Sequence, residues 1–348
     1  MQIFVYEFVT GGGWSTLFDH PAPGSLAIEG RAMRDAIAAD LEAIGSIRVL
    51  TECKGATEYA GATERDAFQQ AAQSADATLI IAPEFDDILA TRHRWAAAVG
   101  ARVLGCGLKT VELAADKQRT AEHLAQHGVN VPQGMFLAAG QPLPHDFAYP
   151  AVLKPVDGAG SLGIRWIGGP EDLPAAPLDH RGWRLEHFCI GMAASVALLC
   201  GPNHIEALPA CRQLLAGVAA APASPFAYCG GELPLPPALD DRARRLGRQV
   251  AATLGVGTPD GPRGWLGIDL MLGDDPAGAH DVVIEINPRL TTSYLGLRRL
   301  ACGNLAAALL AVADGTPSGL SFQTEPLQFA PDGSVTRRSG CDSADFGH

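Results

Sequence analysis

Hydrophobic positions in the first hundred residues fall in short β-branched runs, and longer amphipathic stretches separate these runs. A short apolar run is typical of a buried strand, whereas apolar positions three or four residues apart indicate a helix. The predicted elements are a strand over 2–9, a helix over 25–44, a strand over 47–51, a helix over 64–74 and a strand over 77–82. This alternation predicts parallel strands joined by right-handed crossovers. Gly11, Gly12 and Gly13 follow the first strand, at the end where such sheets bind ligands.

The pattern changes character near Leu108. A helix over 92–99 and a short strand over 102–104 complete the first part, and a long amphipathic helix is predicted over 110–127, ending at Gly128. Strands follow over 151–154, 164–167, 184–189 and 195–200, the first two of them flanking a glycine-rich turn. The second part of the chain is therefore predicted to be α+β.

Proline is unusually frequent in one segment beyond the middle of the chain. It is concentrated between Pro202 and Pro237, which favours loops there. Beyond this segment, the pattern predicts a helix over 240–254, an antiparallel pair of strands over 266–272 and 282–286, and a helix over 304–312. The polar segment from Thr316 is predicted as a loosely ordered tail. The expected divisions are a Rossmann-like domain (1–108), an α+β region (109–315) and a tail (316–348).

Composition narrows the class of partner. The formal net charge is -12 and the sequence pI is about 5.2, which argues against nucleic acid or an anionic membrane and favours small-molecule substrates. The eight cysteines are scattered without paired metal-type spacing, so we expect reduced thiols. The first residues read as a buried strand and not as a leader, and no apolar run reaches membrane-spanning length. We therefore expect a cytoplasmic protein.

A lysine precedes a glycine-rich loop in the segment that runs from Lys154 to Gly163. The loop contains Asp157, Gly158, Gly160 and Ser161. Glycines let backbone N–H groups approach an anion closely, and a lysine supplies a compact positive charge, so the loop is a candidate phosphate-binding loop. An ordinary β-hairpin turn is an equally good interpretation of this loop taken alone.

Asp269, Glu285 and Asn287 are the candidate metal ligands. Asp269 lies on the first strand of the late antiparallel pair and Glu285 on the second, so the two side chains can face each other. Carboxylate and amide oxygens suit Mg²⁺ that is held jointly with nucleotide phosphates. Because apolar residues flank both positions, a buried carboxylate here needs a compensating cation. The alternative is a structural salt bridge with Arg263 or Arg289.

A segment rich in hydrogen-bond donors continues from Asn287. It carries Arg289, Thr291, Thr292, Ser293 and Tyr294. A guanidinium can grip two oxygens of a carboxylate or phosphoryl group at once, so Arg289 is a candidate catalytic residue and the hydroxyl groups are candidate substrate contacts. A solvated surface loop is the less attractive interpretation, because the segment adjoins the candidate metal site.

From Lys109 to Val312 these motifs, in this order, resemble the ATP-grasp superfamily, whose members clamp ATP between two α+β lobes. The resemblance implies an N-terminal Rossmann-like pre-ATP-grasp lobe, a smaller lobe over about 118–190, and ATP with Mg²⁺ or Mn²⁺ as cofactors. It implies that Lys117 and Lys154 hold the nucleotide, that the loop from Asp157 to Gly163 closes over the phosphates, and that Asp269, Glu285 and Asn287 hold the metal. Glu186, His187, Phe188 and Cys189 are similar to the interlobe hinge that binds adenine, and Arg289 matches an arginine that steadies the developing acyl phosphate.

Two positions depart from the family pattern. Ala193 stands where many members have an acid that binds ribose, and Gly267 stands where D-alanine ligase-like members have an arginine. Ribose contacts must therefore come from elsewhere, and Arg289 or Arg263 would have to replace the missing arginine. Arg212 is a further candidate phosphate contact, and a surface arginine is an equally good interpretation.

A narrower resemblance rests on the segments 5–13, 81–85 and 285–294, which are similar to the tyramine–glutamate ligases of methanofuran biosynthesis. It implies a carboxylate–amine ligase that phosphorylates the γ-carboxylate of glutamate and joins it to tyramine or tyrosine, in the synthesis of a furan coenzyme such as methylofuran. It also implies that Gly11 to Gly13 and Thr291 to Tyr294 contact substrate. The alternatives are a nucleotide-binding module without catalysis and an ATP-grasp carboxylase. A homodimer is common in the superfamily, and the sequence leaves the oligomeric state open.

Overall fold

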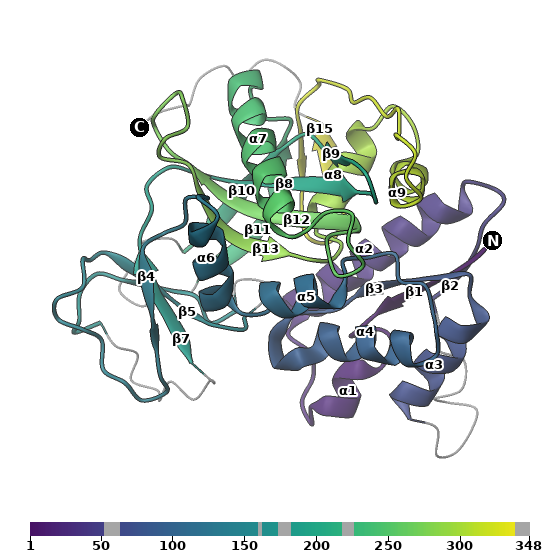
Figure 1. Cartoon of the computed structure of the whole chain (residues 1–348), viewed down its shortest axis with the longest axis horizontal. Helices are drawn as coiled ribbons and strands as arrows, with labels where there is room; N and C mark the ends of the chain where they lie inside the picture. Colours follow the sequence, from purple (N-terminus) through teal and green to yellow (C-terminus); the bar gives the residue numbers. More distant parts are fainter. Residues whose placement is uncertain (52–62, 159–161, 173–181, 218–225, 338–348) are drawn as a thin grey trace.

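The computed structural model describes residues 1–51, 63–158, 162–172, 182–217 and 226–337. Figure 1 shows three parts: an N-terminal domain, a small lobe built on β4, β5 and β7, and a large sheet that lies between them. None of the helices in these ranges is long and apolar enough to cross a bilayer. The predicted fold class, a Rossmann-like lobe followed by two α+β lobes, is confirmed.

The N-terminal domain has the predicted parallel sheet, in the strand order β2-β1-β3. Its elements are β1 (Gln2–Glu7), α1 (Gly13–Leu17), α2 (Gly24–Glu42), β2 (Arg48–Leu50), α3 (Glu64–Ser74), β3 (Ala77–Ile81), the 3₁₀ turn η1 (Phe85–Asp87) and α4 (Ile88–Ala98). Helix α3 begins where the sequence predicts, because Thr63 and Asp66 form a capping box. The strand expected over 102–104 is reduced to one isolated bridge between Thr78 and Val103.

The long helix predicted over 110–127 is wrong, because the structure has two helices there. They are α5 (Leu108–Ala114) and α6 (Lys117–Gln126). The Asp116 backbone is extended, and its carboxylate accepts a hydrogen bond from the Arg119 N–H at 2.9 Å, which caps a new helix. Lys117 is therefore the first residue of α6.

The small lobe is a four-stranded antiparallel sheet in the order β4-β7-β5-β6. Its strands are β4 (Gly134–Leu137), β5 (Ala151–Pro155), β6 (Arg165–Ile167) and β7 (Trp183–His187). Strands β5 and β6 form the hairpin that the glycine-rich turn predicts. Leu153, Trp183 and Leu185 are buried in a core of their own, so this lobe is held separately from the rest of the molecule.

Within the described ranges, the large sheet has eight strands, in the order β13-β12-β8-β10-β11-β14-β15 with β9 paired to β8. Its strands are β8 (Met192–Cys200), β9 (Ile205–Ala207), β10 (Cys211–Ala216), β11 (Ala227–Leu233), β12 (Gly264–Leu272), β13 (Val282–Asn287), β14 (Leu327–Phe329) and β15 (Val335–Arg337). The loops predicted between Pro202 and Pro237 are therefore wrong. Pro202 lies between β8 and β9, Pro209 between β9 and β10, and Pro234 directly after β11, where proline does not interrupt a ladder.

The predicted tail is also wrong up to Arg337. Leu327 and Phe329 are 3% and 1% exposed, and β14 extends the large sheet by pairing with β11. Two apolar side chains at alternate positions are enough to seat a short strand on a core. The remaining residues of the tail, 338–348, lie outside the described part of the chain.

In the described part of the chain, three helices pack on the large sheet, and the last two of them also contact α2 of the N-terminal domain. They are α7 (Pro237–Thr253), α8 (Ser293–Leu300) and α9 (Leu305–Ala313). Helix α9 packs between β8 and α2, and Ile37 and Leu41 of α2 share one apolar core with Leu305 and Leu309 of α9. Figure 1 shows α2 and α9 side by side. The N-terminal domain is therefore fixed against the large sheet, where it can contribute residues to a common site.

Candidate active site

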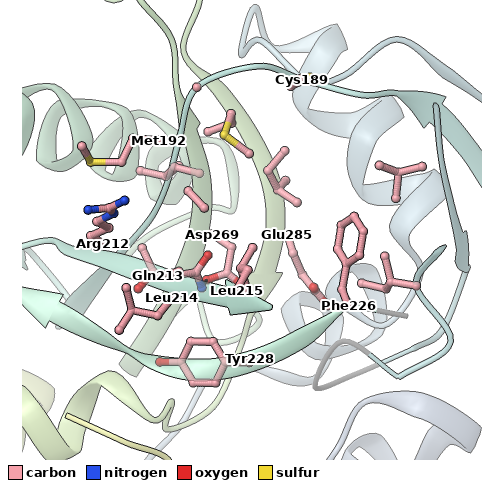
Figure 2. A pocket seen from close by; sticks show the side chains of 18 of the residues that line it. Cys189, Met192, Arg212, Gln213, Leu214, Leu215, Phe226, Tyr228, Asp269 and Glu285 are labelled. Atoms are coloured by element: carbon pink, nitrogen blue, oxygen red, sulfur yellow. Dashed lines mark hydrogen bonds between the residues drawn. The ribbon is translucent and has the colours of Figure 1, made fainter. Parts of the chain in front are cut away.

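One cavity of about 870 Å³ receives side chains from all three parts of the molecule. Its lining includes Lys154, Glu186, His187, Phe188 and Cys189 from the small lobe, Arg212, Gln213, Tyr228, Asp269, Glu285, Asn287 and Arg289 from the large sheet, and Glu29 from α2. Figure 2 shows Asp269, Gln213 and Glu285 in the middle of the cavity, with Tyr228 on a neighbouring strand. The volume suits a nucleotide together with a small substrate.

The candidate metal ligands are brought together as expected. Antiparallel pairing of β12 with β13 places Asp269 opposite Glu285. The Asn287 amide donates to Oδ2 of Asp269 at 3.0 Å, and the Gln213 amide donates to Oδ1 at 2.8 Å. Within the described residues, neither carboxylate forms an ion pair with Arg263 or Arg289, so the structure does not show the salt bridge that the alternative requires.

The electrostatics of this carboxylate pair favour an added cation. Burial, and then the neighbouring charge of Glu285, raise the pKa of the Asp269 carboxyl to about 7. A divalent cation held by these residues would lower the pKa of Asp269 again, because its positive charge favours the ionised carboxylate. No group of three or more histidine, cysteine, aspartate and glutamate side chains in the described chain could hold a metal by itself. The opposed carboxylates and the adjoining Asn287 amide are oxygen donors that fit an ion whose other ligands are phosphate oxygens.

Two buried lysines flank the carboxylates. The Lys117 ammonium pairs with Oε1 of Glu285 at 2.7 Å and donates to the Gly158 carbonyl oxygen. Lys154 pairs with Oε1 of Glu186 at 2.5 Å, while Arg184 holds the other oxygen at 2.8 Å. The side chain of Lys154 is only 2% exposed, yet it lines the cavity. Lys154 thus faces the cavity directly, whereas Lys117 is absent from its lining and adjoins it through Glu285, which lines the cavity.

Only part of the glycine-rich loop is described. Gly158 meets Lys117, and Asp157 accepts a hydrogen bond from the Asp86 backbone N–H at 3.4 Å. Gly163 has φ of +75°, a left-handed conformation that favours glycine. Gly160 and Ser161 lie outside the described residues, so their expected role stays a prediction.

The candidate hinge lies at the end of β7, and Glu186 to Cys189 line the cavity. The backbone N–H of His187 donates to the Gln133 carbonyl at 2.9 Å, and that of Phe188 donates to the Pro150 carbonyl at 3.1 Å. A base that binds here must therefore use other backbone groups of the hinge. Both oxygens of Glu186 already hold cations, and each keeps capacity for a further donor.

Arg289 is held by a partner that the sequence did not suggest. Its Nε is 2.9 Å from Oε1 of Glu84, and its Nη2 donates to Oε2 at 3.1 Å. Glu84 is 3% exposed and follows β3, at the carboxyl end of the parallel sheet. Two signals could have identified it: this position at a strand end, and its place in the segment 81–85 that carries the narrower resemblance. Arg212 lines the cavity at 45% side-chain exposure, 3.9 Å from Glu232.

The candidate substrate residues divide into two groups. Thr291, Thr292 and Ser293 line the cavity, and the Thr292 hydroxyl donates to Glu29. Tyr294 does not, which contradicts its expected substrate contact. Its ring is fully buried in the core, and its hydroxyl donates to Asp40 at 2.6 Å.

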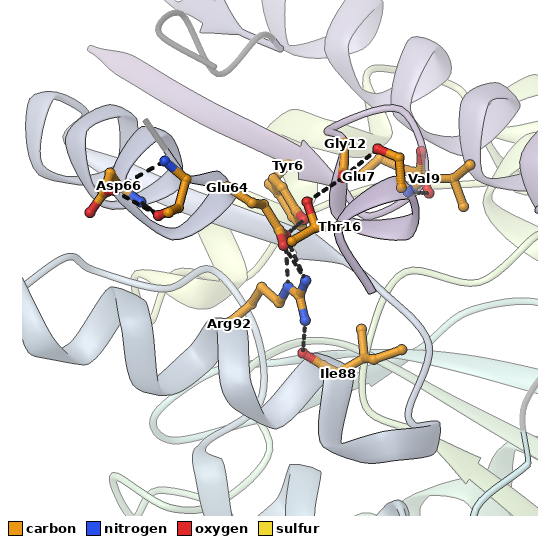
Figure 3. A network of polar contacts seen from close by, with 11 residues as sticks. Tyr6, Glu7, Val9, Gly12, Thr16, Glu64, Asp66, Ile88 and Arg92 are labelled. Atoms are coloured by element: carbon orange, nitrogen blue, oxygen red, sulfur yellow. Dashed lines mark hydrogen bonds and ion pairs between the residues drawn. The ribbon is translucent and has the colours of Figure 1, made fainter. Parts of the chain in front are cut away.

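Gly11, Gly12 and Gly13 are also absent from the cavity lining, so the structure does not support their expected substrate contact, which stays a prediction. A Cβ at Gly11 would lie 2.6 Å from the Tyr6 ring, and one at Gly13 would lie 2.7 Å from Oε1 of Glu64. Gly11 and Gly13 therefore pack against a buried network, in which Glu64 accepts from Tyr6 and from Nη2 of Arg92 at 2.6 and 2.7 Å. Figure 3 shows this network, with the turn that carries Gly12 beside it.

Comparison with known proteins supports the resemblance to the ATP-grasp superfamily. The family described as ATP-grasp domain matches residues 114–293, a little over half of the chain, and the pre ATP-grasp 3 domain matches 54–111. The tyramine–L-glutamate ligase of Methanocaldococcus fervens is 25% identical over 254 residues, which are 73% of this chain and 71% of that protein. A D-alanine–D-alanine ligase of Rhizorhabdus wittichii is 33% identical over 106 residues, 27% of this chain and 33% of that protein. This chain thus covers only a third of that relative's length.

Solved structures share the fold. A putative ATP-grasp superfamily protein from Archaeoglobus fulgidus has a TM-score of 0.67 at 21% identity, covering 95% of this chain and 92% of its own. An L-amino acid ligase from Bacillus licheniformis has a TM-score of 0.64 at 15% identity, covering 94% and 78%. The chain therefore belongs to the ATP-grasp family, and it is an ATP-dependent ligase of that family.

Proposed function

We propose that this enzyme phosphorylates the γ-carboxylate of glutamate with ATP and joins the resulting acyl phosphate to an aromatic amine, tyramine or tyrosine. The observation that carries the proposal is the opposed pair Asp269 and Glu285, which shares one cavity with Lys154 and adjoins Lys117. This arrangement supplies both the negative ligands of a metal ion and the positive charges that phosphates require. The similarity to tyramine–L-glutamate ligases supports the choice of substrates.

Each group of site residues has its own role in phosphoryl transfer. Lys117 and Lys154 bind and orient the triphosphate, and Asp269, Glu285 and Asn287 would hold Mg²⁺. When bound, that ion would neutralise charge on the transferred phosphoryl group. A carboxylate oxygen attacks the γ-phosphorus in line and ADP leaves. The amine nitrogen then attacks the carbonyl carbon, loses a proton and expels phosphate, which leaves an amide.

Arg289 would steady the acyl phosphate. Its guanidinium already donates to Oε2 of Glu84 through Nη2 and forms an ion pair with Oε1 at 2.9 Å, so its orientation is set before substrate arrives. An acyl phosphate is prone to hydrolysis, and the loop from Asp157 to Gly163 would close over the phosphates and exclude water. We place the reaction in furan-coenzyme biosynthesis, such as that of methylofuran, on the similarity to the tyramine–glutamate ligases alone.

The test is a coupled ADP-release screen of the purified enzyme with ATP, Mg²⁺ and glutamate, to which tyramine, tyrosine or other amines are added singly. We expect ADP release that depends on both glutamate and one aromatic amine, with mass spectrometry showing the γ-glutamyl amide. ATP binding without ADP release for every amine would favour a binding module. ADP release that requires bicarbonate and not an amine would favour a carboxylase. Either result would overturn the proposed reaction.

A further inference from the structure

Glu29 is a cavity residue to which none of the steps above gives a role. It lies on α2 of the N-terminal domain and is half-buried in the lining of the cavity. Its Oε1 accepts a hydrogen bond from the Thr292 hydroxyl. Within the described residues, no lysine, arginine or histidine forms an ion pair with it. A carboxylate in such a position gains from a cation that arrives with a ligand.

The cations that line the cavity have other partners. Lys154 is 2.5 Å from Glu186, Arg289 is 2.9 Å from Glu84, and Arg212 is 3.9 Å from Glu232. Of the other acidic groups in the lining, Glu186 and Glu285 form ion pairs with lysines and Asp269 accepts two amide donors. Within the described residues, Glu29 therefore differs from them in having one hydroxyl donor and no ion-pair partner, although its charge and that of the Arg289 guanidinium interact beyond ion-pair distance.

The position of Glu29 relates it to the substrates and not to adenine. Thr292 follows Asn287 and Arg289 in the same segment, whereas the candidate adenine hinge is on the small lobe. The charge of Glu29 also affects Tyr228, another residue of the cavity lining. Burial is the main reason that the pKa of the Tyr228 hydroxyl is well above its usual range, and the charges of Cys211 and Glu29 raise this pKa further. Glu29 thus lies at the end of the cavity where we place phosphoryl transfer.

From this geometry we infer that Glu29 is a specificity-determining residue that binds an ammonium group of a substrate. The inference rests on the proposed function and deepens it, because it assigns the N-terminal domain a direct part in substrate choice. Two substrates carry that chemistry: the α-ammonium of glutamate and the amine nucleophile before it loses its proton. Thr292 orients the carboxylate by donating to one oxygen, which leaves the other oxygen for the ammonium group.

The experiment measures equilibrium binding and does not need turnover. Titration calorimetry on the full chain, in the presence of Mg²⁺ and a non-hydrolysable ATP analogue, gives the affinities of glutamate, glutarate and tyramine for the wild type and for Glu29→Gln. Glutarate lacks the ammonium group of glutamate and keeps both carboxylates. We expect Glu29→Gln to weaken glutamate or tyramine by about tenfold or more, as loss of a charge-assisted contact requires. Glutarate binding should stay within about twofold.

Two variants make the result specific. Glu29→Asp keeps the charge on a shorter stem and should recover part of the lost affinity. Glu42→Gln removes an exposed carboxylate at the end of the same helix and should change nothing. The inference is overturned if Glu29→Gln binds glutamate and tyramine as the wild type does, or if the wild type binds neither. Failure of the proposed reaction is a separate outcome, recognised as binding without ADP release.

Discussion

Replacing Glu285 by glutamine is expected to reduce ADP-forming turnover by at least about a hundredfold, the scale of losing one group that stabilises transition-state charge. The substitution removes a negative ligand from the proposed metal site and the partner of Lys117 at 2.7 Å. Glutamine has nearly the same shape, so the pairing of β12 with β13 should persist. A coupled assay of ADP release with glutamate and the amine measures the loss.

The control for this variant is Glu122→Gln, which removes an exposed carboxylate on α6 beside the site but outside it. It should retain wild-type turnover. Thermal unfolding of both variants should show one cooperative transition close to that of the wild type. Normal amide formation by Glu285→Gln would remove this carboxylate from the proposed metal site.

Replacing Lys154 by methionine is expected to raise the Kd for ATP by about tenfold to a hundredfold. A hydrogen bond to a charged group contributes about 1.5–3 kcal/mol, and each 1.4 kcal/mol is about a factor of ten in affinity. Methionine fills a volume similar to that of the lysine stem, and Arg184 continues to pair with Glu186 at 2.8 Å. The folded state should therefore survive with reduced stability. Calorimetric titration with ATP gives the change in Kd.

Lys109→Met is the matched control. Its side chain is 78% exposed and pairs with Asp260 at the surface, away from the cavity lining. This variant should bind ATP as the wild type does. An unchanged Kd for Lys154→Met, in a protein that unfolds cooperatively, would mean that the ammonium of Lys154 serves only to neutralise Glu186.

The sequence predicts site residues best where a polar residue interrupts a clear strand pattern or adjoins a glycine-rich turn. Asp269 and Glu285 interrupt strongly apolar strands, and a charge in such a strand is costly without a partner, so their pairing could be expected before any coordinates. Antiparallel register alone then brings them together. The Lys154 hairpin follows in the same way, because the loop between β5 and β6 is marked by glycine.

What was missed depends on contacts between distant parts of the chain. Glu84 lies 205 residues from Arg289, and Glu29 lies 263 residues from Thr292. No local pattern links residues so far apart, and only the docking of α2 and β3 against the large sheet joins them. Tyr294 was misassigned for the converse reason: its neighbours line the cavity, but the first turn of α8 directs its ring into the core.

Errors in the secondary structure have local causes. The amphipathic pattern continues through Asp116, so periodicity alone does not reveal that its carboxylate caps α6. Pro202, Pro209 and Pro234 lie between strands or at their ends, and the density of proline in the sequence hides the short strands there. Strand β14 has only two buried apolar residues, which is too weak a signal in a polar segment.

The central claim, that this site activates a carboxylate as an acyl phosphate, can be tested by following oxygen. Glutamate labelled with ¹⁸O in its γ-carboxylate is converted by the enzyme with ATP and the amine, and the released phosphate is analysed by mass spectrometry. If the carboxylate attacks the γ-phosphorus, each phosphate should carry one labelled oxygen and the amide should keep the other. Phosphate that contains no label, formed together with the amide, would contradict the acyl phosphate and the account built on it.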